Sequence, residues 1–141
     1  MPKLEPMEVK FAVLADYANI TREGKLNVLG IFDVINTPAF PVVLPSFNVV
    51  VSYSAGAAEF DSDKDIEIVL CDEDGNILFK AKQKLHIKRP DRAGTLFMTN
   101  QIAAIIGFPF KKAGDYQFSI LVNSEEKKSI SLRVNEIKQV K

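Results

Sequence analysis

Short runs in which apolar residues recur at every second position, separated by clusters of Gly, Pro, Asn and Asp, dominate this 141-residue chain. Such alternation is typical of strands with one face in a core and the other in solvent. Stretches with helical periodicity and helical length are almost absent. The pattern therefore predicts an all-β protein, an antiparallel β-sandwich of about seven to nine strands, immunoglobulin-like or jelly-roll-like.

The expected strands follow from these runs and from the turn residues between them. They cover residues 8–20, 25–35, 47–54, 65–71, 77–88, 95–107, 116–123 and 128–136. The run 25–35 is apolar on both faces, which indicates either a central strand covered twice or, as we favour, a bulge at Gly30. The stretch 101–106 is too short for periodicity to separate a strand from one helical turn, and the strand is the preferred interpretation.

The segment 36–46 contains three prolines, each of which removes a backbone donor and restricts the residue before it. We expect it to cross the fold as a stiff, irregular stretch. Its apolar side chains either plug one end of the sandwich, which is the favoured prediction, or form a partner-contact patch with the apolar segment 108–110. The residues of this candidate patch are Phe40, Val43, Leu44, Phe108 and Phe110.

Length and composition agree with a single domain over residues 1–141. A hydrophobic content of 47% is ample for one core in a chain of this size. No apolar stretch approaches the roughly 18 residues of a membrane span, and residues 1–10 do not resemble a signal peptide. A cytoplasmic location without a membrane partner is therefore expected.

The residue types of common catalytic and metal sites are scarce. With one Cys and one His, neither a disulfide framework nor a multi-histidine metal cluster can form. Cys71 and His86 are expected about 26 Å apart along a hairpin, beyond any nucleophile–base contact. Asp61, Asp63 and Asp65 lack the glycine and the closing glutamate of a calcium loop. We expect no catalytic residues, no metal and no cofactor.

The strand expected at 77–88 carries basic groups at every second position, a pattern that can bind the phosphates of nucleic acid. These are Lys80, Lys82, Lys84, His86 and Lys88. A tight turn with both Asp74 and Gly75 at positive φ, however, sets a register that opposes this row with acids. The predicted facing pairs are Glu67–Lys82, Asp65–Lys84, Asp63–His86, Asp61–Lys88 and Cys71–Leu78. Because 18 basic and 18 acidic residues also balance over the chain, no nucleic-acid partner is expected.

Two segments resemble a family of small, uncharacterised bacterial proteins, a domain of unknown function. The first runs from ADYAN at 15–19 into GKLNVLGIFD at 24–33, and the second is AGDYQF at 113–118. The resemblance implies a β-sandwich and a bacterial, cytoplasmic setting, and it brings no catalytic or binding residue. In many sandwiches the tyrosine of a late Gly-x-Tyr bonds nearby backbone with its hydroxyl, which is the expectation for Tyr116.

The sequence thus favours a non-enzymatic binding or protein-interaction module, with an unidentified protein or small ligand as partner. The alternative from another class is a small carboxylate-dependent hydrolase or isomerase, for which Asp16 and Asp33 would be examined first. A third hypothesis is an oligomeric structural protein whose copies pair through an edge strand, because sandwich edges are hard to protect.

Overall fold

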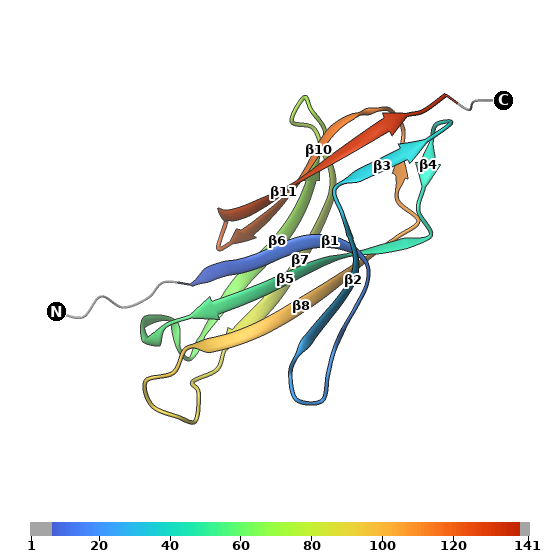
Figure 1. The fold of residues 1–141 in the computed structure, drawn as a ribbon. Coiled ribbons are helices and arrows are strands. Elements are labelled where there is room, and N and C mark those ends of the chain that lie inside the picture. The colour runs from blue at the N-terminus through green and yellow to red at the C-terminus, as the bar shows by residue number, and fades with distance from the viewer. Residues whose placement is uncertain (1–6, 139–141) are drawn as a thin grey trace.

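The computed structural model describes residues 7–138, and it is built almost wholly from β-strands (Figure 1). The strands are β1 (Glu8–Ile20), β2 (Leu26–Phe32), β3 (Val34–Thr37), β4 (Val42–Val43), β5 (Ser46–Ala55), β6 (Ser62–Cys71), β7 (Ile77–Ile87), β8 (Phe97–Ile106), β9 (Pro109–Phe110), β10 (Gly114–Val122) and β11 (Glu125–Glu136). The helical part of the described chain is one 3-10 turn, Ala57–Glu59. No helix in this part of the chain has the length and apolar character of a transmembrane span.

Two main sheets pack face to face, which confirms the all-β sandwich. The first has the order β2-β1-β5-β8 and the second the order β3-β11-β10-β6-β7, while β4 and β9 form a separate pair. In the view of Figure 1 the four-stranded sheet lies in front. Side chains from both sheets fill the space between them; the rings of Phe47 on β5 and Phe118 on β10 meet edge to face at 6.1 Å.

The run 25–35 is not one strand, contrary to the sequence-based prediction. β2 pairs with β1 in the first sheet, whereas β3 crosses to the second sheet and pairs with the end of β11. The β3–β11 pairing is parallel, so the sandwich is not purely antiparallel. The run looked apolar on both faces because Leu29 and Ile31 of β2 are apolar but exposed to solvent, whereas Ile35 of β3 is buried.

The expected bulge at Gly30 is also wrong. Ala15 faces Ile31 and Tyr17 faces Leu29, so the register has the same offset on both sides of the glycine. Gly30 does take a positive φ of 72°. A Cβ there would lie 2.5 Å from a carboxylate oxygen of Asp16, so the glycine makes room for that side chain.

The β6–β7 hairpin has the predicted register over most of its length. Glu67 faces Lys82, Asp65 faces Lys84 and Asp63 faces His86, as expected. At the open end the ladder stops at Ser62–Ile87, so the predicted Asp61–Lys88 pair is wrong. Asp61 instead turns away at a φ of 61°.

The hairpin turn is longer than predicted by one residue, and an inserted residue in β7 compensates for this. Gly75 has a positive φ of 83° but Asp74 does not, and the Asp72 amide donates to the Asn76 carbonyl at 3.1 Å. The loop therefore has three residues instead of two, as in a type I turn followed by a left-handed glycine. The register then shifts between Leu70 and Cys71, so Cys71 faces Ile77 instead of Leu78. Leu78 is the inserted residue, and it restores the predicted pairing beyond it.

Three further segments bear on the sites described below. Residues 101–106 belong to β8 and are a strand, as preferred. The 36–46 crossing contains β4, whose Val42 faces Phe110 of β9. The β10–β11 turn is Asn123-Ser124, both at positive φ (49° and 68°), and is thus shorter than the gap between the expected strands 116–123 and 128–136.

Candidate functional site

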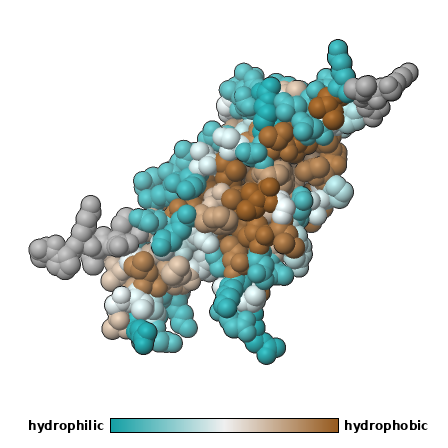
Figure 2. All heavy atoms as spheres, viewed as in Figure 1, coloured by the Kyte–Doolittle hydropathy of each residue, from teal (hydrophilic) through white to brown (hydrophobic). Residues whose placement is uncertain are grey.

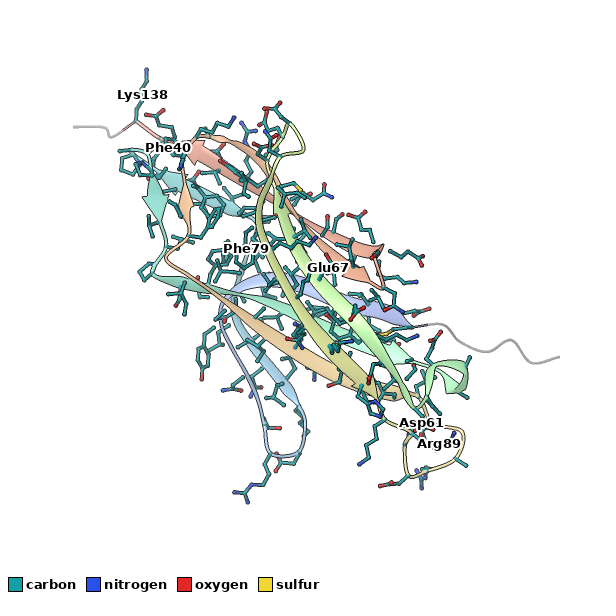
Figure 3. All side chains as sticks on the ribbon, turned by 180° about the vertical axis from the view of Figure 1, so that it is seen from behind. Phe40, Asp61, Glu67, Phe79, Arg89 and Lys138 are labelled. Atoms are coloured by element: carbon teal, nitrogen blue, oxygen red, sulfur yellow. The ribbon has the colours of Figure 1, made fainter. Side chains whose placement is uncertain are left out.

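The two apolar segments of the candidate patch meet at one end of the sandwich. β4 and β9 pair directly, with Val43 facing Pro109. Phe110 is buried (1% exposed), Val43 is 48% exposed, and the remaining patch residues, Phe40, Leu44 and Phe108, are half-buried. Figure 3 shows Phe40 at this end and Asp61 with Arg89 at the opposite end. The segments thus act mainly as a plug, with exposed apolar surface at Val43.

A cavity of about 420 Å³ opens beside β9. Phe108 and Phe110 of the patch line it, whereas Phe40, Val43 and Leu44 lie outside it. The full lining is Asp72, Leu78, Phe108, Pro109, Phe110, Lys111, Lys112 and Tyr116. Leu78 is the inserted residue of β7, so the hairpin's irregularity helps to form the wall.

Aromatic rings form the floor of this cavity. Phe108 and Phe110 meet edge to face at 5.0 Å, and Phe110 and Tyr116 do so at 5.1 Å. Phe47 continues the stack into the core, 6.4 Å from Phe110. Edge-to-face contacts of this kind add to the apolar burial of each ring, so the floor is a fixed part of the core.

Tyr116 fixes the segment that carries the cavity's basic residues. Its hydroxyl donates to the Lys112 carbonyl oxygen at 2.6 Å, which is the backbone bond expected for this tyrosine. Burial raises the pKa of the Tyr116 hydroxyl, although the Lys112 contact opposes the shift. The hydroxyl is therefore a neutral donor that is already used, and it holds residues 112–116 in place.

The acid at the rim, Asp72, is occupied by the hairpin turn. Its Oδ1 accepts from the Asp74 and Asn76 amides (3.0 and 2.9 Å), and its Oδ2 accepts from the Asn76 side chain at 3.1 Å. The Asn76 side-chain bond is the main cause that lowers the pKa of Asp72. Lys112 lies 3.9 Å from Asp74 in a loose, exposed pair. The rim thus presents two lysines, while its one carboxylate already accepts three bonds.

Three of the five residues of the basic row, Lys80, Lys84 and His86, contact acids of β6. Lys80 contacts Glu67 at 3.1 Å and Lys84 contacts Asp65 at 3.6 Å. His86 lies 2.7 Å from Asp63, and Arg89 lies 3.0 Å from Asp61. Glu67, labelled in Figure 3, reaches Lys80 although Lys82 is its facing residue. Compensated lysines of this kind release few counterions, which weakens the case for a phosphate-binding face.

The candidate catalytic residues are not assembled into one site. Asp33 lines a shallow cavity of about 370 Å³ with six apolar residues, and Asp16 lies outside it. Asp16 is opposite Gly30, three residues from Asp33, or about 10 Å along the strand. Cys71 faces Ile77, nine residues or about 30 Å from His86. Within residues 7–138, His, Cys, Asp and Glu side chains form no group of three that could hold a metal ion.

Sequence reasoning missed most of the cavity because its walls come from distant parts of the chain. Leu78 and Asp72 belong to the β6–β7 hairpin, and Lys112 and Tyr116 precede or begin the β10 ladder. The one available signal was the Gly-x-Tyr pattern, which marked Tyr116 as a corner residue without indicating a ligand site.

Comparisons with known proteins give a family and likenesses to solved structures. A family model described as "Family of unknown function (DUF6941)" matches residues 10–135. None of the curated proteins matches the sequence. The chain is similar in structure to Pseudomonas fluorescens alkylpurine DNA glycosylase AlkC bound to DNA containing an abasic site analog, with 13% sequence identity and a TM-score of 0.46. That match covers 91% of this chain and 30% of the glycosylase chain.

Proposed function

This chain belongs to DUF6941, a family of unknown function, and from its geometry we propose that it is a non-enzymatic binding module. The observation that carries the proposal is the aromatic-floored cavity beside β9 with Lys111 and Lys112 at its rim. The proposed ligand has an apolar part that enters the cavity and a carboxylate that lies at the rim. No bond is made or broken in this function; the cavity recognises shape, apolarity and charge.

The size and lining of the cavity support an apolar ligand group. A volume of about 420 Å³ lies in the range of pockets that take small ligands or single large side chains. Leu78 is 41% exposed at the wall, so its surface is available for burial. Removing apolar surface of this kind from water is favourable by roughly 25 cal/mol per Å².

Charge at the rim supports an anionic head group. Asp72 accepts three hydrogen bonds from its own turn, and Lys112 forms only a loose, exposed pair with Asp74 at 3.9 Å. Lys111 and Lys112 are both exposed, and the Tyr116 hydroxyl fixes the backbone of this segment by donating to the Lys112 carbonyl oxygen. A carboxylate next to the apolar group would pair with these ammonium groups at the edge of the cavity.

Two sources supply this chemistry: a free carboxylic acid with an aliphatic tail, and the C-terminal residue of a partner protein with an apolar side chain. The test follows amide NMR shifts of the full chain titrated with octanoate, with 1-octanol as the uncharged match. A second arm uses acetyl-Gly-Gly-Leu with a free carboxylate against its C-terminal amide. Tighter binding of octanoate than of the free-carboxylate peptide identifies a free aliphatic acid as the natural ligand. Tighter binding of the peptide identifies the C-terminus of a partner protein.

The double variant Lys111→Gln/Lys112→Gln should weaken binding of the charged probe about fivefold and leave 1-octanol unchanged. The matched control is Lys25→Gln/Lys128→Gln, which removes two exposed lysines elsewhere and should change neither affinity. Leu78→Asp should weaken the charged probe further by placing a carboxylate at the wall. Equal affinity for octanoate and 1-octanol in the unmodified chain, with no preference for the free carboxylate in the peptide arm, would overturn the proposal.

A further inference from the structure

One long edge of the sandwich has an open hydrogen-bonding side. In the described chain β8 is bonded to β5 alone, over ten facing pairs from Ser46–Ile106 to Ala55–Phe97. The register keeps one offset throughout, so no bulge interrupts β8. The opposite side of the strand presents a regular row of backbone N–H and C=O groups.

β8 lacks the devices that normally keep an edge strand from pairing with another chain. Its sequence, FMTNQIAAII, contains no charged residue, no proline and no glycine. Lysines, prolines, bulges and short length are the usual protections of an edge. The polar side chains Asn100 and Gln101 accept hydrogen bonds from Ser52 and Tyr53 of β5, so they are turned back toward their own sheet.

The other three edges are protected or interrupted. β7 carries three lysines and the inserted Leu78, and β3 has four residues. β2 is uncharged but is shorter, with seven residues, and the left-handed φ of Gly30 makes its edge irregular. β8 is thus the longest edge without a protecting feature.

The outward face beside this edge is also apolar. Met98 and Ile106, near the two ends of β8, are 65% and 77% exposed. They continue a face on which Leu29 and Ile31 of β2 are exposed as well. Figure 2 shows apolar side chains gathered over this side of the molecule.

We propose that β8 pairs antiparallel with β8 of a second copy of this chain, which joins two four-stranded sheets into one continuous eight-stranded sheet. A two-fold axis then passes by Ile102. With the axis at Ile102, residue i of one copy faces residue 204 − i of the other. Facing residues then point to the same side of the sheet, as strand pairing requires. Met98 faces the second copy's Ile106, and Ile102 faces its own equivalent.

The chemistry of β8 suits a second copy in particular. Self-pairing across a two-fold axis sets each residue opposite a residue of the same strand, so any charge in the middle of the strand would oppose its own equivalent at a cost. An uncharged strand avoids this. The register through Ile102 also matches the two most exposed apolar side chains with each other, whereas a register through Gln101 would put Met98 opposite Ala104.

The contact is small, so the dimer is reversible. Nine facing residues span about 30 Å, and a sheet edge about 10 Å thick then offers roughly 300 Å² of flat area per copy. The two copies together then bury about 600 Å², well below the roughly 1,200 Å² at which standard interfaces begin, so the dimer is a weak, transient one. The fraction of dimer therefore depends strongly on protein concentration.

The test measures mass by sedimentation velocity from about 5 µM to about 500 µM. The unmodified chain should move from its 15.7 kDa mass toward twice that value. Ile102→Lys and Ile102→Glu should each remain monomeric over the range, because equal charges face each other at the axis. An equimolar mixture of the two should associate again, since lysine then faces glutamate.

Gln83→Lys on β7 is the matched control, since it adds the same charge to the other open edge strand and should leave the association unchanged. Ala104→Lys, at an exposed position of β8, tests the edge without removing a large apolar contact and should weaken association at least fivefold. A monomer at every concentration would overturn the proposal. So would loss of the dimer in Leu29→Lys with retention in Ile102→Lys, which would assign the contact to β2.

Discussion

The two long edge strands, β7 and β8, meet the same core but present opposite chemistry to solvent. β7 closes the five-stranded sheet and β8 the four-stranded sheet. Each buries an isoleucine in the common core, Ile87 at 0% and Ile105 at 3% exposure. On its outward face β7 carries Lys80, Lys82, Lys84 and His86, whereas β8 has no charge at all.

The lysines of β7 therefore protect the open edge of the sheet more than they stabilise the fold. Their ion pairs, such as Lys80–Glu67 and Lys84–Asp65, lie at the surface and contribute about 0.2–1 kcal/mol each. The same charges make β7 a poor template for another strand. β8 has an edge of nearly the same length without such charges, as expected of an edge strand that pairs with another chain.

The largest loss of stability is expected from the buried isoleucine that each of the two strands places in the common core. Ile87→Ala and Ile105→Ala should each lower the free energy of unfolding by about 2–5 kcal/mol, because each leaves a cavity in the same core. Urea denaturation of both variants checks this. If Ile105→Ala cost almost nothing, β8 would be loosely held, and its outward chemistry would be no guide to its role.

A smaller effect is expected when the lysines that distinguish β7 from β8 are removed. The triple variant Lys80→Thr/Lys82→Thr/Lys84→Thr makes β7 resemble β8, so each molecule has two open edges and should form assemblies larger than dimers. Light scattering as a function of concentration measures the assembly mass. Removal of Lys25, Lys111 and Lys128 by threonine, which changes the net charge equally away from β7, is the control. Equal assembly in both triple variants would show that net charge, not edge protection, governs solubility.

The smallest effect is expected on the pH dependence of Tm, from Asp72 in the turn that sets the β7 register. The folded-state pKa of Asp72 is lowered, chiefly by the Asn76 side-chain bond, so Asp72 stabilises the fold above its ordinary pKa. That contribution is lost as the pH falls through the lowered value. Between about pH 6 and about pH 2.5, Tm of Asp72→Asn should therefore fall less steeply than Tm of the unmodified chain. The same variant should dimerise normally, because the turn is remote from β8.

The hairpin shows how far local pattern can determine structure. The facing of acids and bases on β6 and β7 was predictable because the apolar and charged rows agree on one register. The three-residue loop was not, because the inserted Leu78 restores the same offset and leaves no trace in the alternation. In contrast, Val34 and Ile35 continue the apolar run of β2, and no local signal shows that the chain changes sheets at Asp33.

Both candidate sites depend on strand order, which a single sequence does not reveal. The meeting of residues 40–44 with 108–110 was foreseen as a conditional patch, but the cavity also needs Leu78 and Tyr116 from two other strands. An edge-strand contact was foreseen in general terms. That the edge is β8 follows only from its place at the end of the β2-β1-β5-β8 sheet.

The most direct test of the β8 contact is disulfide trapping at its two-fold axis. In a Cys71→Ser background, Ile102→Cys places two thiols on facing residues whose Cα atoms are about 4.5–5.5 Å apart in an antiparallel pair, within the reach of a disulfide. Pairing of β8 with itself predicts rapid formation of a cross-linked dimer under mild oxidation for Ile102→Cys and little for Lys82→Cys at the middle of β7. Equal cross-linking of the two, or selective cross-linking of Lys82→Cys, would contradict it.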